Sequence, residues 1–176
     1  MFTLIRAQPI SSSLLLFMYR LGDSFPYLLN RVGVRIGELF SQRLKPYEVT
    51  LPMYRVLASL WEKGDQRLNE LSDVTSLETS TLSRLIGIME DRGFVTRSRL
   101  EDNARVVAIN LTKQGRALTE ELIPLAVQFE EVAIHSFGKS EVARLKRAMK
   151  DVYDHLNALD PRTLEEPPYK RESSAR

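Results

Sequence analysis

A run of hydroxyl side chains that ends in an arginine occupies residues 79–84 (Thr-Ser-Thr-Leu-Ser-Arg). Hydroxyls hydrogen-bond to nucleic-acid bases and phosphates, and an arginine can bond guanine through two parallel hydrogen bonds. If the run opens a helix, the unpaired backbone amides of the first turn also favour phosphate. The same residue types are common helix caps, so the run alone leaves capping and nucleic-acid binding equally open. The candidate contacts are Thr79, Ser80, Thr81, Ser83 and Arg84.

Three more arginines lie in or beside two runs of strand-forming residues, 94–99 and 106–111. The polar segment 101–104 (Glu-Asp-Asn-Ala) separates the runs, which predicts a β-hairpin. An arginine on a projecting ribbon can enter a narrow minor groove of DNA. The alternative is a solvated hairpin whose acidic residues pair with the arginines, an arrangement that contributes little to stability. The candidates are Arg97, Arg99 and Arg105.

Helical periodicity organises the rest of the chain. Thr50 is a good N-cap, Pro52 suits a first helical turn, Pro124 should kink its helix, and Ser140 is the expected cap of the last helix. A helix–turn–helix followed by a ribbon is a winged-helix arrangement, so we expect a mainly α fold with a small β-hairpin wing (α+β). The expected helices are 24–44, 51–63, 68–74, 79–92, 113–137 and 140–159.

The last expected helix carries a narrow apolar seam with residues three and four positions apart, as in a heptad repeat. Such a seam needs a partner, which is either a second copy of the chain or the first helix of the same chain. The seam comprises Val142, Leu145, Met149, Val152, Leu156 and Leu159. The expected organisation is an N-terminal arm (1–23), dimerisation helices (24–48 and 114–160), a winged helix-turn-helix domain (49–113) and a disordered tail (161–176).

Composition excludes several classes of function. The 176 residues include no cysteine, which excludes disulfides and thiolate catalysis. His135 and His155 are too far apart for a common zinc motif, and neither has a nucleophile or paired carboxylates at motif spacing. No glycine-rich phosphate loop is present. We therefore expect no enzyme activity, no metal and no cofactor.

The N-terminal arm has several interpretations. The apolar run 14–19 is shorter than the core of a signal peptide, and Arg20 closes it without a small-residue cleavage site. Either the arm packs on the body or on a partner subunit, or Met18 is the true start and the preceding residues are an artefact. A membrane tether is a remote third reading, because no run approaches the roughly 20 apolar residues of a span. We expect a cytoplasmic protein with no membrane contact.

Several spaced motifs resemble one family together. They are residues 80–85 (Ser-Thr-Leu-Ser-Arg-Leu), residues 89–95 (Met-Glu-Asp-Arg-Gly-Phe-Val), Arg105 six residues before Leu111, and Gly115. This combination, over residues 24–160, resembles the MarR family of bacterial transcription regulators. The resemblance implies an obligate homodimer whose recognition helix reads the major groove and whose wing arginine enters the minor groove. By position, Ser80, Thr81, Ser83 and Arg84 would contact the groove or phosphates, and Arg105 would be the wing arginine.

The resemblance has one departure in the wing and one implication for ligands. Asn103 stands where the family usually has an Asp two residues before the wing arginine, and it cannot form the same ion pair. Many family members release DNA when a small ligand, often aromatic, binds between the dimer helices and the winged domain. Some that resemble this recognition helix sense acyl-CoA thioesters. The candidate effector contacts are Tyr27, Arg31, Tyr54 and Trp61, unless the aromatics are core and Arg31 is solvated.

The function expected from the sequence is a homodimeric, sequence-specific regulator that binds double-stranded DNA. We expect a repressor, released by a small ligand, that recognises a pseudo-palindromic operator with half-sites about one helical turn apart. The alternative is a winged-helix protein-interaction module without DNA binding. Charge favours the alternative, because the net charge of the chain is only +2 and residues 66–113 carry seven basic and seven acidic side chains. The outward hydroxyls and Arg84 oppose it, because protein-binding faces are richer in aromatics.

Overall fold

The computed structural model describes residues 19–100 and 103–159, apart from the side chains of residue 100 and residues 103–106. Most of the expected arm, the tip of the hairpin and the expected tail lie outside the described residues. The described chain forms two compact units, residues 19–129 and residues 130–159. None of the helices in the described ranges is long and apolar enough to cross a bilayer.

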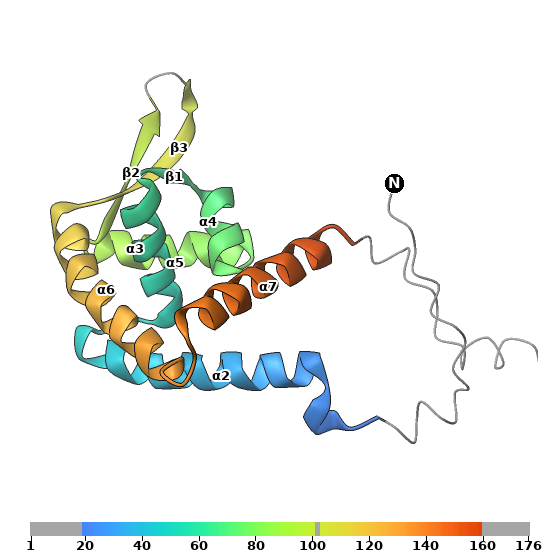
Figure 1. Cartoon of the computed structure of the whole chain (residues 1–176). Helices are drawn as coiled ribbons and strands as arrows, with labels where there is room; N and C mark the ends of the chain where they lie inside the picture. Colours follow the sequence, from blue (N-terminus) through green and yellow to red (C-terminus); the bar gives the residue numbers. More distant parts are fainter. Residues whose placement is uncertain (1–18, 101–102, 160–176) are drawn as a thin grey trace, which may run out of the picture. The chain divides into compact units, whose positions relative to one another are not determined.

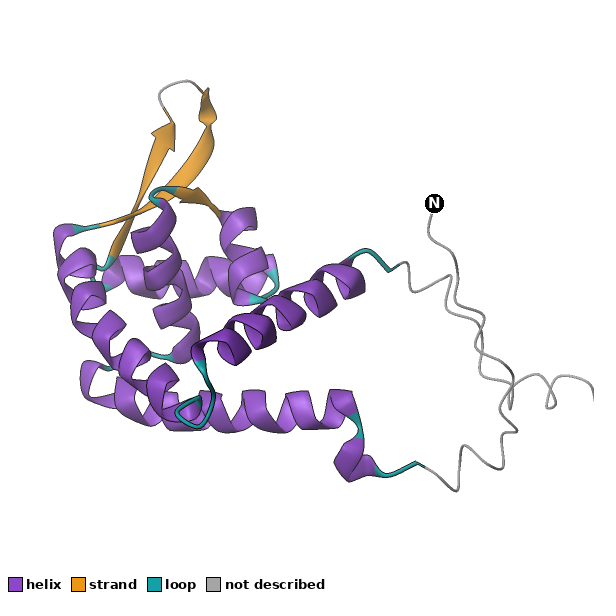
Figure 2. Ribbon diagram, viewed as in Figure 1, coloured by secondary structure: helices purple, strands orange, loops and turns teal. Residues whose placement is uncertain are grey.

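The first unit contains most of the elements (Figures 1 and 2). Its strands are β1 (Gln66–Arg67), β2 (Val95–Leu100) and β3 (Asn103–Leu111). Two 3₁₀ turns, η1 (Leu21–Asp23) and η2 (Lys45–Tyr47), flank the first long helix. The helices of the described chain are α2 (Phe25–Leu44), α3 (Leu51–Lys63), α4 (Leu68–Thr75), α5 (Thr79–Asp91), α6 (Lys113–Ala133) and α7 (Lys139–Asn157).

The helices α2 to α5 begin and end within about one residue of the sequence prediction. For α3, the predicted residues at both ends take the expected roles. The Thr50 hydroxyl accepts a hydrogen bond from the Met53 amide at 3.4 Å, and Pro52 lies in the first turn of α3. Gly64 ends that helix with a φ of 80°, a conformation that favours glycine. Trp61 of α3 is 42% exposed, so the core alternative does not hold for this aromatic residue.

The two C-terminal helices differ from their predicted bounds. The helix α6 ends at Ala133 instead of Phe137, since residues 134–136 form a turn closed by the bond from the Phe137 amide to the Ile134 carbonyl. The cap of α7 is Gly138 and not Ser140. The Glu141 carboxylate accepts the Gly138 amide at 2.8 Å, which satisfies a free donor two residues earlier than predicted.

A three-stranded antiparallel sheet with the order β1-β3-β2 forms the wing and its base. The strands β2 and β3 pair with Val95 opposite Leu111 and Arg97 opposite Ile109, and the ribbon extends away from the helices of the first unit (Figure 2). The hairpin prediction is confirmed, although β3 begins at Asn103 and not at residue 106. The two-residue strand β1 was missed because it is too short to show a periodic pattern.

The core of the first unit joins segments that the sequence had assigned to separate regions. Phe40 and Leu44 of α2 and Leu122 of α6 are buried with residues of the winged module. The end of α2 and the first half of α6 therefore pack into the core of the winged module and do not merely connect it to other helices. The module contributes Val56, Leu57, Leu60, Leu71, Leu82, Ile86, Met89 and Ile109 to this core.

The beginning of α6 lies directly against the residues that lead into β2. The Thr112 hydroxyl donates to the Gly93 carbonyl at 2.6 Å and accepts the Gly115 amide at 2.9 Å. A Cβ atom at Gly115 would lie only 1.9 Å from the Phe94 carbonyl oxygen. Glycine is required here because the two backbones approach too closely for any side chain.

The second unit leaves its apolar seam uncovered. No residue of α7 is buried, and one ion pair, between Lys146 and Glu130, joins α7 to the preceding helix. The seam residues Leu145, Met149, Leu156 and Leu159 are all exposed, and Val142 and Val152 are half-buried. In the first unit, α2 likewise exposes Phe25, Leu28, Leu29, Val32, Val34 and Ile36.

Candidate nucleic-acid interface

The helix α5 separates its residues into a buried and an exposed side. Leu82, Ile86 and Met89 are buried in the core. None of the hydroxyls of the exposed run makes a hydrogen bond within the described residues, and the N-cap of α5 is Glu78. The hydroxyls of this run are therefore not used to cap the helix, and they face solvent. The exposed residues are Thr79, Ser80, Thr81, Ser83 and Arg84.

The turn between α4 and α5 sets the direction of the recognition helix without a glycine. Ser76 has a φ of 56°, in the left-handed region that favours glycine. The Ser72 hydroxyl donates to the Leu77 carbonyl at 2.5 Å, and Arg55 of α3 donates to the Thr75 carbonyl at 3.4 Å. These bonds satisfy one carbonyl at the end of α4 and one carbonyl in the turn that follows it.

The three wing arginines have different surroundings. Arg99 is exposed and has no ion pair within the described part of the chain. Arg105 belongs to β3, but its side chain lies outside the described part. Arg97 is engaged by α5: its guanidinium lies 2.7 Å from the Glu90 carboxylate. The sequence predicted the same role, DNA contact, for all three arginines, because strand position alone does not reveal the carboxylate of a neighbouring helix.

The base of the wing also contacts the loop that follows α3. The Asn110 side chain contacts the Ser98 hydroxyl of β2 at 2.8 Å. With the carbonyl of Asn110 accepting that hydroxyl, its amide nitrogen lies 3.3 Å from both carboxylate oxygens of Asp65. This group ties the two long strands to the loop after α3. The sequence analysis missed it, since its members are far apart in the chain.

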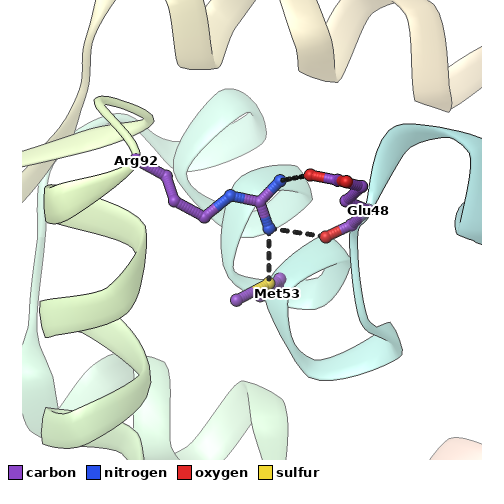
Figure 3. Close-up of polar contacts among 3 residues, drawn as sticks. All are labelled: Glu48, Met53 and Arg92. Atoms are coloured by element: carbon purple, nitrogen blue, oxygen red, sulfur yellow. Dashed lines mark hydrogen bonds and ion pairs between the residues drawn. The ribbon is translucent and has the colours of Figure 1, made fainter.

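The C-terminal end of α5 is tied to the connection between α2 and α3 (Figure 3). The Arg92 guanidinium donates to the Glu48 carbonyl at 2.5 Å and lies 3.4 Å from the Glu48 carboxylate. It also stacks over the Phe94 ring at 4.7 Å. Glu48 has a φ of 54°, so its bonded carbonyl lies in a turn of uncommon backbone conformation.

The four effector candidates do not form one group. Arg31 lies over the Tyr27 ring at 5.5 Å, on the exposed half of α2. Tyr54 packs edge-on against Phe40 at 4.9 Å, and burial raises the pKa of its phenol. None of the four lines the open hollow of about 370 Å³ on the surface of the first unit. That hollow is lined by Tyr47, Phe94, Gln114, Ala117, Leu118 and Glu121.

Comparison with known proteins decides the family. Residues 49–107 match the model of the MarR family. The HTH-type transcriptional regulator SarZ of Staphylococcus aureus is 31% identical over 106 residues, which cover 58% of this chain and 70% of SarZ. The chain belongs to the MarR family.

Other relatives of this MarR-family chain agree over most of its length. The HTH-type transcriptional repressor IacR of Pseudomonas putida is 25% identical over 138 residues, or 78% of this chain and 83% of IacR. A MarR family transcriptional regulator from Silicibacter pomeroyi DSS-3 superimposes with a TM-score of 0.69 at 28% identity, over 78% of this chain and 98% of that one. The family establishes a DNA-binding transcription regulator with a winged-helix fold, and not an enzyme.

Proposed function

We propose that this MarR-family regulator is a homodimeric repressor that reads a pseudo-palindromic operator and leaves it when a small ligand binds. The observation that carries DNA recognition is the exposed face of α5, whose hydroxyls and Arg84 lack partners within the described residues. The N-terminal residues of a recognition helix contact base edges in the major groove. The proposed contacts on α5 are Thr79, Ser80, Thr81, Ser83 and Arg84.

The wing supplies the second set of proposed contacts. Arg99 is exposed on the described part of the ribbon, and Arg105 belongs to the strand that follows its tip. We assign both to the minor groove or its flanking phosphates, where arginine is favoured by the negative potential. Arg97 differs, because Glu90 holds its guanidinium.

The proposed homodimer explains the two uncovered apolar faces. The face of α2 and the seam of α7 expose long apolar side chains such as Phe25, Val32 and Leu156. Exposed apolar patches of this kind usually mark association sites. A second copy would cover both faces, and the resulting twofold symmetry calls for an inverted repeat in the DNA.

Repression and release by a ligand are the most specific parts of the proposal. The relative IacR is named a transcriptional repressor, which supports repression here. The proposed effector is a small aromatic acid or its CoA ester, contacted by residues of α2 and α3, and the proposed place of action is the cytoplasm. Calorimetry with hydroxycinnamates and their CoA esters tests the ligand, and the absence of heat would remove it. The proposed contacts are Tyr27, Arg31, Tyr54 and Trp61.

Binding of the full-length protein to duplex DNA at increasing salt tests the DNA-binding role. Each phosphate contact releases counterions, so the logarithm of the binding constant should fall with the logarithm of the salt concentration by about 0.9 per contact. Fluorescence anisotropy with a labelled duplex measures this slope. A flat dependence, or no binding, would instead favour a winged-helix module that contacts protein.

Gly87 provides a prediction with opposite effects on stability and binding. It lies on α5 three residues after Arg84, on the exposed side, and a Cβ atom there would meet nothing within 4 Å. A helix-interior glycine costs about 0.5–1 kcal/mol relative to alanine. We therefore expect Gly87→Ala to raise the midpoint of urea unfolding and to weaken DNA binding several-fold, because the added methyl group faces the DNA. Unchanged affinity would show that the DNA does not approach this part of α5.

A further inference from the structure

Within the described residues, Arg97 makes the hydrogen bonds that join the strand β2 to α5. Its backbone amide donates to Glu90 Oε1 at 3.2 Å, and its guanidinium Nη1 lies 2.7 Å from Glu90 Oε2. The second guanidinium nitrogen, Nη2, donates to the backbone carbonyl of Ser83 at 3.4 Å. Both oxygens of one carboxylate and one carbonyl of the recognition helix are thus occupied by Arg97.

These bonds extend along α5 from Ser83, near the end of the run of proposed DNA contacts, to Glu90 in the last turn. Ser83 and Glu90 are seven residues apart, which is about two helical turns on one side of α5. Arg97 is therefore fixed to α5 at two levels, and Ser83 belongs to the exposed run. The base of the wing cannot rotate against α5 without breaking at least one of these bonds.

Stability does not explain the ion pair between Glu90 and Arg97. The side chains of Arg97 and Glu90 are 39% and 35% exposed, and half-exposed pairs of this kind contribute little to folding. Glu90 also lies in the last turn of α5, where the helix dipole disfavours a negative charge. A carboxylate beside a DNA-binding surface should in addition repel phosphate. The value of the pair must therefore lie in geometry.

We propose that Arg97 is a positioning residue: with Glu90, it sets the angle between the wing and the recognition helix and does not itself contact DNA. This inference rests on the proposed DNA-binding function and reassigns one of its sequence-predicted contacts. Arg97 then positions the wing and Arg99 contacts DNA, although both side chains are exposed on the same strand, two residues apart.

Four single variants separate positioning from direct contact. Glu90→Gln and Arg97→Gln each break the pair. Asp91→Asn removes a carboxylate from the adjacent position of α5, where no bond is made within the described residues, and Arg99→Gln removes the next arginine of the same strand. Two measurements are made on each full-length protein: the affinity for a duplex selected from a random pool with its salt slope, and hydrogen exchange of the wing without DNA.

If Arg97 is a positioning residue, Glu90→Gln should weaken DNA binding by about tenfold, although it removes a charge that repels phosphate. Arg97→Gln should weaken binding to a similar degree without lowering the salt slope. A variant that combines Glu90→Gln with Arg97→Gln should bind no more weakly than either single variant. Arg99→Gln should lower the slope by about 0.9 per half-site, and Asp91→Asn should leave binding unchanged or tighten it. Exchange at residues 95–99 should quicken in the Glu90 and Arg97 variants only.

Two results would overturn the proposal. Tighter binding by Glu90→Gln would mean that Glu90 restrains an arginine that contacts phosphate. A salt slope lowered by Arg97→Gln as much as by Arg99→Gln would make Arg97 a direct contact. Failure of the unaltered protein to bind any duplex would instead contradict the proposed function, and the exchange measurement would still decide whether Glu90 and Arg97 fix the wing.

Discussion

Replacing Arg84 with alanine is expected to remove most of the affinity for the operator while leaving the fold intact. The side chain is exposed near the N-terminal end of α5 and makes no hydrogen bond within the described residues. A bidentate contact from arginine to guanine contributes about 1–3 kcal/mol, and a dimer loses one contact in each half-site. Few other single side chains of this surface combine exposure with two parallel donors.

The measurement is the affinity for a selected duplex by anisotropy, with circular dichroism to confirm the fold. Arg35→Ala is the matched control, because it removes the same charge from an exposed position of α2, where Arg35 pairs with Glu38 one turn away. Arg84→Lys should recover the charge but not the discrimination for guanine. Equal affinities for Arg84→Ala and the unaltered protein would contradict the placement of α5 in the major groove.

Gly115→Ala is expected to have the largest effect on stability. Its added methyl group would lie 1.9 Å from the Phe94 carbonyl oxygen, which is backbone and cannot rotate away. Either α6 or the segment that leads into β2 must then shift, at a cost of at least about 1–3 kcal/mol. Because the Thr112 hydroxyl bonds both sides of this contact, the shift should also break its hydrogen bonds.

Urea unfolding of the full-length protein measures this effect directly. The same substitution at Gly87 is the control, since it adds a methyl group in open space and should stabilise the chain. Opposite changes in the two midpoints are therefore expected from one chemical change. A Gly115→Ala midpoint equal to that of the unaltered protein would show that the two backbones separate at no cost.

The fold was predictable wherever a signal repeats along the chain. The periods of α2 to α5, the Thr50 cap and the alternating hairpin strands all depend on neighbouring residues, and the structure confirms them. The strand β1 has only two residues, so no period can reveal it. The cap of α7 was misassigned because a serine is the commoner signal, whereas here a glutamate three residues after Gly138 bonds its amide.

The candidate site was predictable in residue type but not in pairing. The exposed run on α5 follows from its helical period, which places Leu82 and Ile86 inside. The partners of Arg92 and Arg97 do not follow, because charge balance alone cannot say which carboxylates they meet. Glu48 is 44 residues from Arg92 in sequence, and the turn that presents its carbonyl depends on the packing of α2 and α3.

Selection of bound duplexes from a random pool by the full-length protein tests the central claim most directly. A homodimer with one recognition helix per subunit should enrich an inverted repeat whose arms are centred about one helical turn apart. Enrichment of such a repeat by the unaltered protein, and its loss in Arg84→Ala, is the predicted result. Retention of DNA without a shared motif, or no retention at all, would contradict a dimeric, sequence-specific regulator.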